Sequence, residues 1–350
     1  MPRLRMARLT QFRPAVPRVP DFPWPTGAAS GLGSLPGTDI AEAQRTIFGE
    51  LPDLAHLAEL PARGPGAEII GRTAGFLVDL PVQIYAGRWQ VAPRPGKDLR
   101  RTADLLARDL DQLSEQGDTY PGTFKVQAAG PWTMAASVDL QIGGRLLRDP
   151  GAVRDLTDSL AEGLRRHVAE VQKRMPRATV VLQVDEPSLP TVIAGHVPTE
   201  SGLSVYPPVD GPDAATALRT ITESAGVPVI VHCCAPDVPL QVVRDSNAAA
   251  VALDLALLKD LDPLGEFIEA GFGLFAGAVP TRPASAGHDP SSAEIAERVR
   301  KLWNRLGFPS RRLPEQVVVT PACGLAGASE KYSRAVLKAC RDAGRRLAEV

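Results

Sequence analysis

Short apolar runs alternate along the chain with longer stretches in which apolar residues recur every three or four positions. The near-continuous apolar runs are typical of strands buried on both faces, and the wider spacing predicts amphipathic helices. Helices are expected over 98–116, 150–175, 213–226, 291–307 and 327–348. Strands are expected over 123–133 and 179–187 and in the runs VPVIVHCC, AAVALDL, FGLFAGAVP and QVVVTPACG.

The alternation of strands and helices predicts a parallel sheet with helices on its outside. Two or three further strands are expected before residue 97, so the total is about eight. Residues 81–96 are ambiguous, and no linker long enough to divide domains interrupts 97–350. We therefore predict one (β/α)8 TIM barrel over 28–350, preceded by an irregular, proline-rich N-terminal extension over 1–27.

Composition and charge narrow the class of protein. The chain has 350 residues, of which 44% are hydrophobic, and its 39 Lys and Arg against 40 Asp and Glu give a net charge of −1. Such a balance gives no general attraction to nucleic acid or to an anionic membrane, so neither is expected as a partner. No apolar stretch reaches the roughly 20 residues that span a bilayer.

The N-terminus and the cysteines suggest a location. The first residues are basic but no apolar segment follows them, which argues against a secretory signal. Four cysteines in the whole chain are too few for a disulfide scaffold. We expect a reducing compartment and a cytoplasmic protein.

Polar residues gather where the predicted strands end. In a (β/α)8 barrel the carboxyl ends of the strands meet at one face and carry the chemistry. Here these ends read Gly33-Ser34, Gly130-Pro131, Asp185-Glu186, His232-Cys233-Cys234, Asp254 and Cys323-Gly324. Residues far apart in the sequence are therefore expected to share one site.

His232 and Cys234 lie two positions apart at the end of one strand, so both side chains point to the same side and Cys233 points to the other. Cys323 ends another strand, and Asp254 ends the strand that follows the His-Cys pair. One imidazole, two thiolates and a carboxylate make a plausible tetrahedral zinc site. The alternative is that the cysteines are small core residues and His232 a hydrogen-bonded core histidine.

Asp185 follows a strongly apolar strand, where a carboxylate is costly to bury unless it is paired or used. In a barrel mouth it could receive an ammonium group. It could instead cap a helix or pair with an arginine. Glu186 and Cys340 are more readily explained as structural residues.

Six motifs in order resemble the catalytic C-terminal barrel of cobalamin-independent methionine synthases. They are GLGSLPGT, AAGPWTMA, LQVDEPSL, VIVHCC, VALDL and TPACGLAG, and they extend from about residue 30 to 330. The wider superfamily also includes corrinoid:thiol methyltransferases and uroporphyrinogen decarboxylases. The resemblance implies a TIM barrel and a methyltransferase that acts on a thiol.

The resemblance assigns roles to residues. It implies zinc ligands at His232, Cys234 and Cys323, with Asp254 where the family usually has glutamate. It places the substrate amino group at Asp185 and the amino-acid backbone at Gly33 and Ser34. In the family, zinc keeps a bound homocysteine thiol deprotonated, so that the thiolate can accept a methyl group.

The sequence departs from the family on the side of the methyl donor. Ser137 stands where the folate-stacking tryptophan is usual, and FAGAVPTRP lacks the family's Asp and proton-donor His. Thr191 replaces a glutamate, and Glu59 is a weak substitute for the usual His-Gly-Glu motif. The second barrel of the full-length enzymes has no counterpart in these 350 residues.

We therefore predict a zinc-dependent methyltransferase that converts L-homocysteine to L-methionine. A corrinoid donor, either methylcobalamin or a corrinoid protein, is favoured over methyltetrahydrofolate. The alternatives are methylation of a different thiol, a non-catalytic zinc-binding barrel, and a decarboxylase-like barrel without metal.

Overall fold

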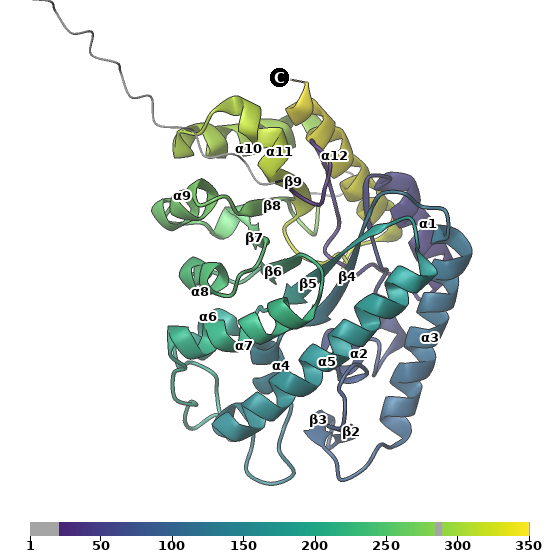
Figure 1. Ribbon diagram of the computed structural model, residues 1–350, viewed down its shortest axis with the longest axis vertical. Coiled ribbons are helices and arrows are strands. Elements are labelled where there is room, and N and C mark those ends of the chain that lie inside the picture. Colours follow the sequence, from purple (N-terminus) through teal and green to yellow (C-terminus); the bar gives the residue numbers. More distant parts are fainter. Residues whose placement is uncertain (1–20, 284–288, 350) are drawn as a thin grey trace, which may run out of the picture.

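A curled parallel sheet forms the centre of the computed structural model, which describes residues 21–283 and 289–349 (Figure 1). Seven strands are hydrogen-bonded in the order β1-β4-β5-β6-β7-β8-β9, and all neighbours are parallel. Two more strands, β2 and β3, form a separate antiparallel hairpin. The strands are β1 (Leu54–His56), β2 (Val82–Tyr85), β3 (Arg88–Val91), β4 (Thr123–Ala129), β5 (Thr179–Asp185), β6 (Val229–Cys233), β7 (Ala250–Asp254), β8 (Gly273–Val279) and β9 (Val317–Pro321).

Residues 28–35 lie between the two outer strands of this sheet. Ala29 forms a parallel bridge with Val319 of β9, and Ser34 forms one with Glu59, just after β1. Backbone hydrogen bonds run from Ser30 to Val319 at 3.0 Å and from Leu35 to Glu59 at 2.9 Å. This irregular segment is the eighth strand of the arrangement, so the predicted TIM-barrel fold is confirmed.

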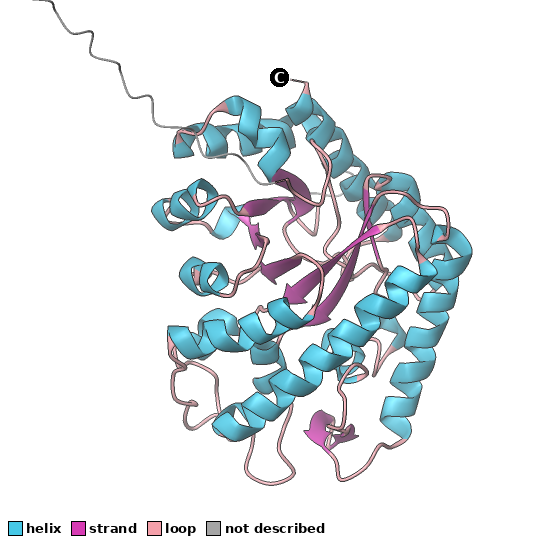
Figure 2. Ribbon diagram, viewed as in Figure 1, coloured by secondary structure: helices cyan, strands magenta, loops and turns pink. Residues whose placement is uncertain are grey.

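Helices surround the sheet and alternate with its strands (Figure 2). The α-helices are α1 (Ile40–Glu50), α2 (Ile69–Ala74), α3 (Lys97–Gly117), α4 (Pro131–Ala135), α5 (Pro150–Arg174), α6 (Leu189–Ile193), α7 (Gly211–Ser224), α8 (Leu240–Asp245), α9 (Asp262–Glu269), α10 (Ser292–Leu306), α11 (Leu313–Gln316) and α12 (Glu330–Ala348). The 3-10 helices are η1 (Pro61–Arg63), η2 (Leu146–Arg148), η3 (Leu255–Leu257) and η4 (Ser310–Arg312).

Local sequence explains where the long helices begin. The Asp149 side chain accepts from the first backbone amides of α5, and Pro150 occupies the first helical position, where its missing amide is harmless. At α10 the Ser291 hydroxyl accepts from the Glu294 amide, as the Ser-x-x-Glu pattern predicts. Gly307 then ends α10 in the left-handed conformation, with φ 77°.

The barrel interior has an apolar floor, separate from the large core between strands and helices. Inward-facing strand residues pack there around Trp24, which is only 4% exposed and meets Phe275 edge-on at 5.0 Å between ring centroids. Its indole N–H lies 3.3 Å from the Glu315 carbonyl. Part of the predicted extension, from residue 21 to 27, therefore packs against the bottom of the barrel, while residues 1–20 lie outside the described residues.

The ambiguous segment 81–96 forms the β2–β3 hairpin. The Asp139 amide donates to the Trp89 carbonyl, the Asp139 carbonyl accepts from the Val91 amide, and Arg88 pairs with the Asp139 carboxylate at 2.9 Å. The hairpin is therefore bound to the loop that follows β4 and α4. Among the described residues, no helix is long and apolar enough to cross a membrane.

Candidate metal and substrate site

Parallel register brings the predicted site residues together at the carboxyl ends of the strands. Asp185, the last residue of β5, lies directly beside His232 of β6. Cys234 follows β6, and Cys323 follows β9 across the barrel. Because every strand runs in the same direction, these ends share one face.

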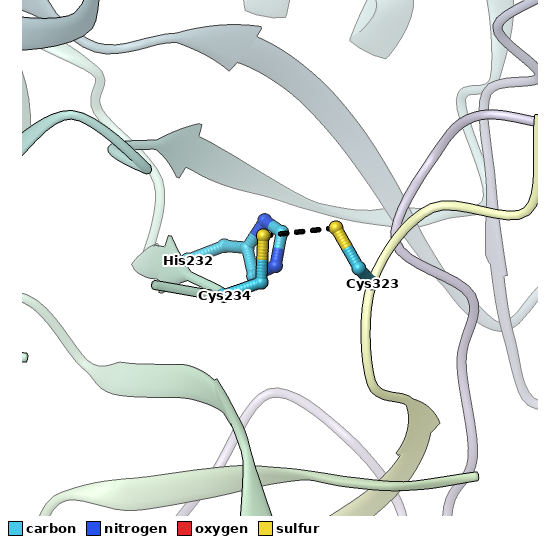
Figure 3. Close-up of side chains that lie close together, drawn as sticks. All are labelled: His232, Cys234 and Cys323. Atoms are coloured by element: carbon cyan, nitrogen blue, oxygen red, sulfur yellow. Dashed lines mark hydrogen bonds between the residues drawn. The ribbon is translucent and has the colours of Figure 1, made fainter. Parts of the chain in front are cut away.

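His232, Cys234 and Cys323 form a compact group of possible metal ligands (Figure 3). Their ligand atoms all lie within 4.8 Å of one another, and the two sulfurs are 2.9 Å apart. Cys233 is fully buried and points away from this group, and burial raises its pKa to about 12. The side-chain alternation of the strand thus separates the two neighbouring cysteines.

The His232 ring is held by the Asp185 carboxylate on one side and lies close to the two cysteine sulfurs on the other. Its Nδ1 lies 2.8 Å from Asp185 Oδ1, and Asp185 also accepts from Gln183 Nε2 at 2.6 Å. Its Nε2 is buried and has no hydrogen-bond partner among residues 21–283 and 289–349. A carboxylate on Nδ1 with a free Nε2 is the usual arrangement of a metal-binding histidine.

The electrostatics of the site favour a positive charge on the His232 imidazole. Burial alone would lower the pKa of His232, but the hydrogen bond and charge of Asp185, together with Cys323, outweigh burial and raise it to about 9. A metal cation could occupy the place of that proton.

The contact between the two sulfurs shifts the pKa values of Cys234 and Cys323 in opposite directions. The thiol of Cys234 can hydrogen-bond to Cys323 and His232 lies beside it, so the pKa of Cys323 is lowered. The pKa of Cys234 is raised by the same contact and by burial. A cation would relieve the repulsion between two thiolates, and one nitrogen with two sulfurs suits zinc. These residues therefore fit the ion that the sequence predicts.

Asp254 occupies the end of β7, but its carboxylate makes a local contact. Its Oδ1 accepts from the Ala256 amide at 2.8 Å and so closes the turn into η3. In the described part of the chain it is not among the three grouped ligands. It lines a cleft of about 510 Å³ that also touches Ala322, the neighbour of Cys323. Its role as a fourth ligand stays a prediction.

Gly33, Ser34 and Glu59 lie where the first strand meets β1. Gly33 has φ 122°, and a Cβ there would come within 2.9 Å of Glu59 Oε2, so only glycine allows this close approach. A side chain at Gly324 would overlap the Ser34 hydroxyl. The first strand thus separates Glu59 from the loop that carries Cys323.

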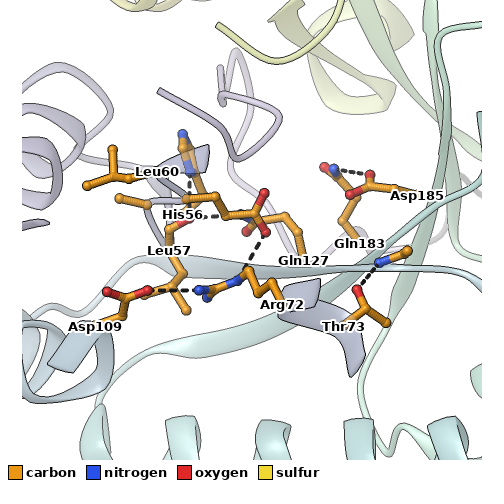
Figure 4. A network of polar contacts seen from close by, with 12 residues as sticks. His56, Leu57, Leu60, Arg72, Thr73, Asp109, Gln127, Gln183 and Asp185 are labelled. Carbon is orange, nitrogen blue, oxygen red and sulfur yellow. Dashed lines mark hydrogen bonds and ion pairs between the residues drawn. The ribbon is translucent and has the colours of Figure 1, made fainter. Parts of the chain in front are cut away.

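Glu59 is nearly buried, and burial raises its pKa to about 7 although Arg72 Nε lies 3.4 Å from its Oε1. Arg72 also binds Asp109 at 2.8 Å (Figure 4). Arg63 binds the same carboxylate at 2.6 Å. Sequence reasoning missed these three partners. One feature of the sequence points to them: a charged residue, Asp109, lies on the buried face of the amphipathic helix α3.

Further polar side chains from the strands were also missed. They face the barrel interior between the apolar floor and the strand ends: His56, Lys125, Gln127, Gln183 and Thr320. The sequence feature that could have revealed them is a polar residue at every second position of a predicted strand, as in TFKVQ and VVLQVD. Glu186, by contrast, accepts from the amides of Trp132 and Thr133 and supports α4.

An imidazole and two thiols at the strand ends of a parallel α/β barrel lie where barrel enzymes have their active sites, and these side chains could bind a metal ion. Residues 24–346 match the family described as "Cobalamin-independent synthase, Catalytic domain", and the chain belongs to that family of methionine synthase-like methyltransferases. It is therefore the catalytic domain of an enzyme. No curated protein matches this sequence.

Two solved structures show the same fold. One is a B12-independent methionine synthase from Shewanella sp. W3-18-1 in complex with selenomethionine, with a TM-score of 0.61 and 14% identity over 93% of this chain and 98% of that one. The other is a methyltransferase from Methanosarcina mazei, with a TM-score of 0.53 and 13% identity over 91% and 94% of the two chains.

Proposed function

We propose that the protein is a zinc-dependent thiol methyltransferase that converts L-homocysteine to L-methionine. The observation that carries this proposal is the geometry around His232: its buried Nε2 has no hydrogen-bond partner within the described residues, while Cys234 and Cys323 place two sulfurs beside the ring. His232, Cys234 and Cys323 would hold zinc, and Asp254 is a possible fourth ligand. When bound, zinc would lower the pKa of the substrate thiol so that the thiolate is available at neutral pH.

The protein residues around this group suit the amino-acid end of the substrate. Asp185 and Glu59 offer carboxylates near the strand ends, where an ammonium group would offset their burial. Gly33 and Ser34 bring backbone close to Glu59, which would fix the orientation of the amino acid. An oriented thiolate could then attack the donor's methyl group in line, forming the S–CH₃ bond as the methyl leaves its donor without its bonding electrons.

A corrinoid donor, methylcobalamin or a corrinoid protein, is favoured over methyltetrahydrofolate. A labile methyl–cobalt bond needs no proton donor at a folate nitrogen, and the FAGAVPTRP segment at the end of β8 has neither His nor Asp. Trp132 is buried and donates its indole N–H to the Ala214 carbonyl at 3.0 Å, so its packing supports α7 and offers little surface for stacking. The family description concerns synthases independent of cobalamin, so folate is the second donor to test.

A matrix of donors and thiols tests the proposal. Zinc-loaded protein is incubated with methylcobalamin or methyltetrahydrofolate, and with homocysteine or thiols that lack its amino group. We expect methionine from homocysteine and methylcobalamin, and its loss in His232→Ala. Product only from another thiol would redefine the substrate, and no transfer from either donor would refute the methyltransferase proposal.

A further inference from the structure

Two arginines and two carboxylates form a buried chain of charges that joins helix α3 to the end of β1. Arg63 donates to both oxygens of Asp109, at 2.6 and 2.8 Å. Arg72 Nη1 donates to Oδ2 of the same carboxylate at 2.8 Å (Figure 4). Arg72 Nε lies 3.4 Å from Glu59 Oε1, which is an ion-pair distance. None of the four side chains is more than 10% exposed, so the chain of charges is shielded from water.

Stability alone does not explain such a network. The cost of removing charges from water largely offsets the attraction between them, and apolar side chains would fill the same space at least as well. Asp109 belongs to the outer helix α3, whereas Glu59 follows β1 and lies beside Ser34 of the first strand. The network therefore points to a role at Glu59, the member that reaches the strand ends.

Arg72 extends from a short helix, α2, that is fixed at both ends. The Glu68 carboxylate caps the first turn and also accepts from the indole N–H of Trp89 in the hairpin. After Arg72, the Thr73 hydroxyl accepts from the amide of Ala129, the last residue of β4, at 2.8 Å. The Arg72 side chain thus starts from a fixed point, and Asp109 fixes its guanidinium.

The two oxygens of Glu59 have different surroundings. Oε1 is the oxygen next to Arg72, whereas Oε2 faces Gly33, where a Cβ would come within 2.9 Å of it. Burial raises the pKa of Glu59, Arg72 lowers it, and the charge of Asp185 raises it again. Two buried carboxylates that repel each other are suited to a cation that interacts with both.

We propose that Arg72 is a positioning residue that makes the site selective for thiols with an α-amino group: it holds Glu59 by Oε1, so that Oε2 can accept from the substrate ammonium. This inference rests on the proposed function, because it takes Glu59 as part of the ammonium site. Asp109 holds the guanidinium of Arg72 from the side of α3. Arg63 supplies a second cation to Asp109, so that Arg72 remains available to Glu59.

Arg72→Lys separates the position of Glu59 from the charge beside it. Lysine keeps the positive charge, but its single ammonium on a flexible stem cannot hold Asp109 and Glu59 in one fixed geometry. Arg63 still pairs with Asp109 in this variant, so that buried carboxylate is not left alone. The matched control is Arg165→Lys, which changes an exposed arginine on α5.

Calorimetric titration of the zinc-loaded proteins measures the selectivity. The two ligands are L-methionine and the methionine analogue in which hydrogen replaces the amino group. We expect Arg72→Lys to bind methionine about tenfold more weakly than the wild type does, because a misplaced carboxylate forfeits a charged hydrogen bond. The analogue should bind both proteins equally, and Arg165→Lys should match the wild type for both ligands. An equal loss for the two ligands would indicate a merely structural role and overturn the inference.

A double-mutant cycle with Glu59→Gln tests whether Arg72 acts through Glu59. Glu59→Gln alone should weaken methionine binding and leave the analogue unaffected. In that background, Arg72→Lys should weaken methionine binding by less than about twofold further. If Arg72→Lys instead causes the same loss with and without Glu59→Gln, Arg72 acts independently of Glu59 and the inference is wrong.

Asp109→Asn decides the question if Arg72→Lys does not fold. It weakens the hold on Arg72 while the charges of Arg72 and Glu59 stay in place, so a loss for methionine alone is expected, and unchanged selectivity overturns the inference. A wild type that prefers methionine to the analogue by a margin that the variants leave intact refutes only the positioning role. A wild type with no such preference refutes the ammonium site of the proposed function as well.

Discussion

Replacing Asp185 with asparagine tests the metal site most directly. Asp185 and His232 are each only 5% exposed, and the Nδ1–Oδ1 distance is 2.8 Å. In Asp185→Asn the side-chain oxygen can still accept from Nδ1, so the orientation of the ring is retained. Only the negative charge behind the imidazole is lost.

The size of the effect follows from the change in the hydrogen bond. A bond to a charged group contributes about 1.5–3 kcal/mol, and a neutral one about 0.5–1.5 kcal/mol. The difference of roughly 1.4 kcal/mol corresponds to about tenfold weaker zinc binding. Asp185→Ala also leaves the buried N–H of His232 without a partner, so zinc should bind to this variant up to about a hundredfold more weakly than to the wild type.

Competition with a chromogenic zinc chelator measures both affinities. Asp155→Asn, which removes an exposed carboxylate from α5, is the matched control and should bind zinc as the wild type does. If folded Asp185→Asn holds zinc as tightly as the wild type, Asp185 does not support a metal-binding histidine and the reasoning is wrong.

Three further outcomes are expected. Cys323→Ser should purify with little zinc and no transferase activity, whereas Cys340→Ser, buried in α12, should retain both; the reverse would place the metal elsewhere. Trp24→Ala opens the barrel floor and should lower the free energy of unfolding in urea by about 3–5 kcal/mol, and a loss under about 1 kcal/mol would show that the floor is not sealed by this residue. His167 is buried and its pKa is lowered to about 3, mainly by desolvation, so folded protein loses stability as pH falls below the unfolded value near 6.5. The free energy of unfolding of His167→Phe, relative to that of the wild type, should therefore rise by about 1.4 kcal/mol for each pH unit lowered between about pH 6 and pH 4. Parallel plots of unfolding free energy against pH for the two proteins would contradict this.

Sequence periodicity predicts most of the regular structure, because the spacing of apolar residues along a strand or helix shows which of its faces are buried. The runs around His232 and Asp254 are apolar throughout, as parallel strands covered on both faces must be. The first strand is harder to predict, because glycines and proline interrupt it and it pairs only through single bridges at Ala29 and Ser34. The hairpin over 81–96 is similarly weak, because its strands are short and only partly buried.

The amino-acid sequence by itself determined which residues could serve as ligands. Side-chain alternation places His232 and Cys234 on one side of a strand, and the position of Cys323 at another strand end follows from the same periodicity. These are local properties, so they can be predicted before the fold is known.

Only the tertiary structure decided how the buried charges are shared. It places Asp185 on the Nδ1 of His232 and joins Arg63 and Arg72 to Asp109. It also buries Lys125 where no described residue forms a hydrogen bond with its Nζ. Such pairings depend on which side chains meet across the barrel and on how much water is excluded there. Both quantities arise from closing eight strands into one interior, and no single strand contains them.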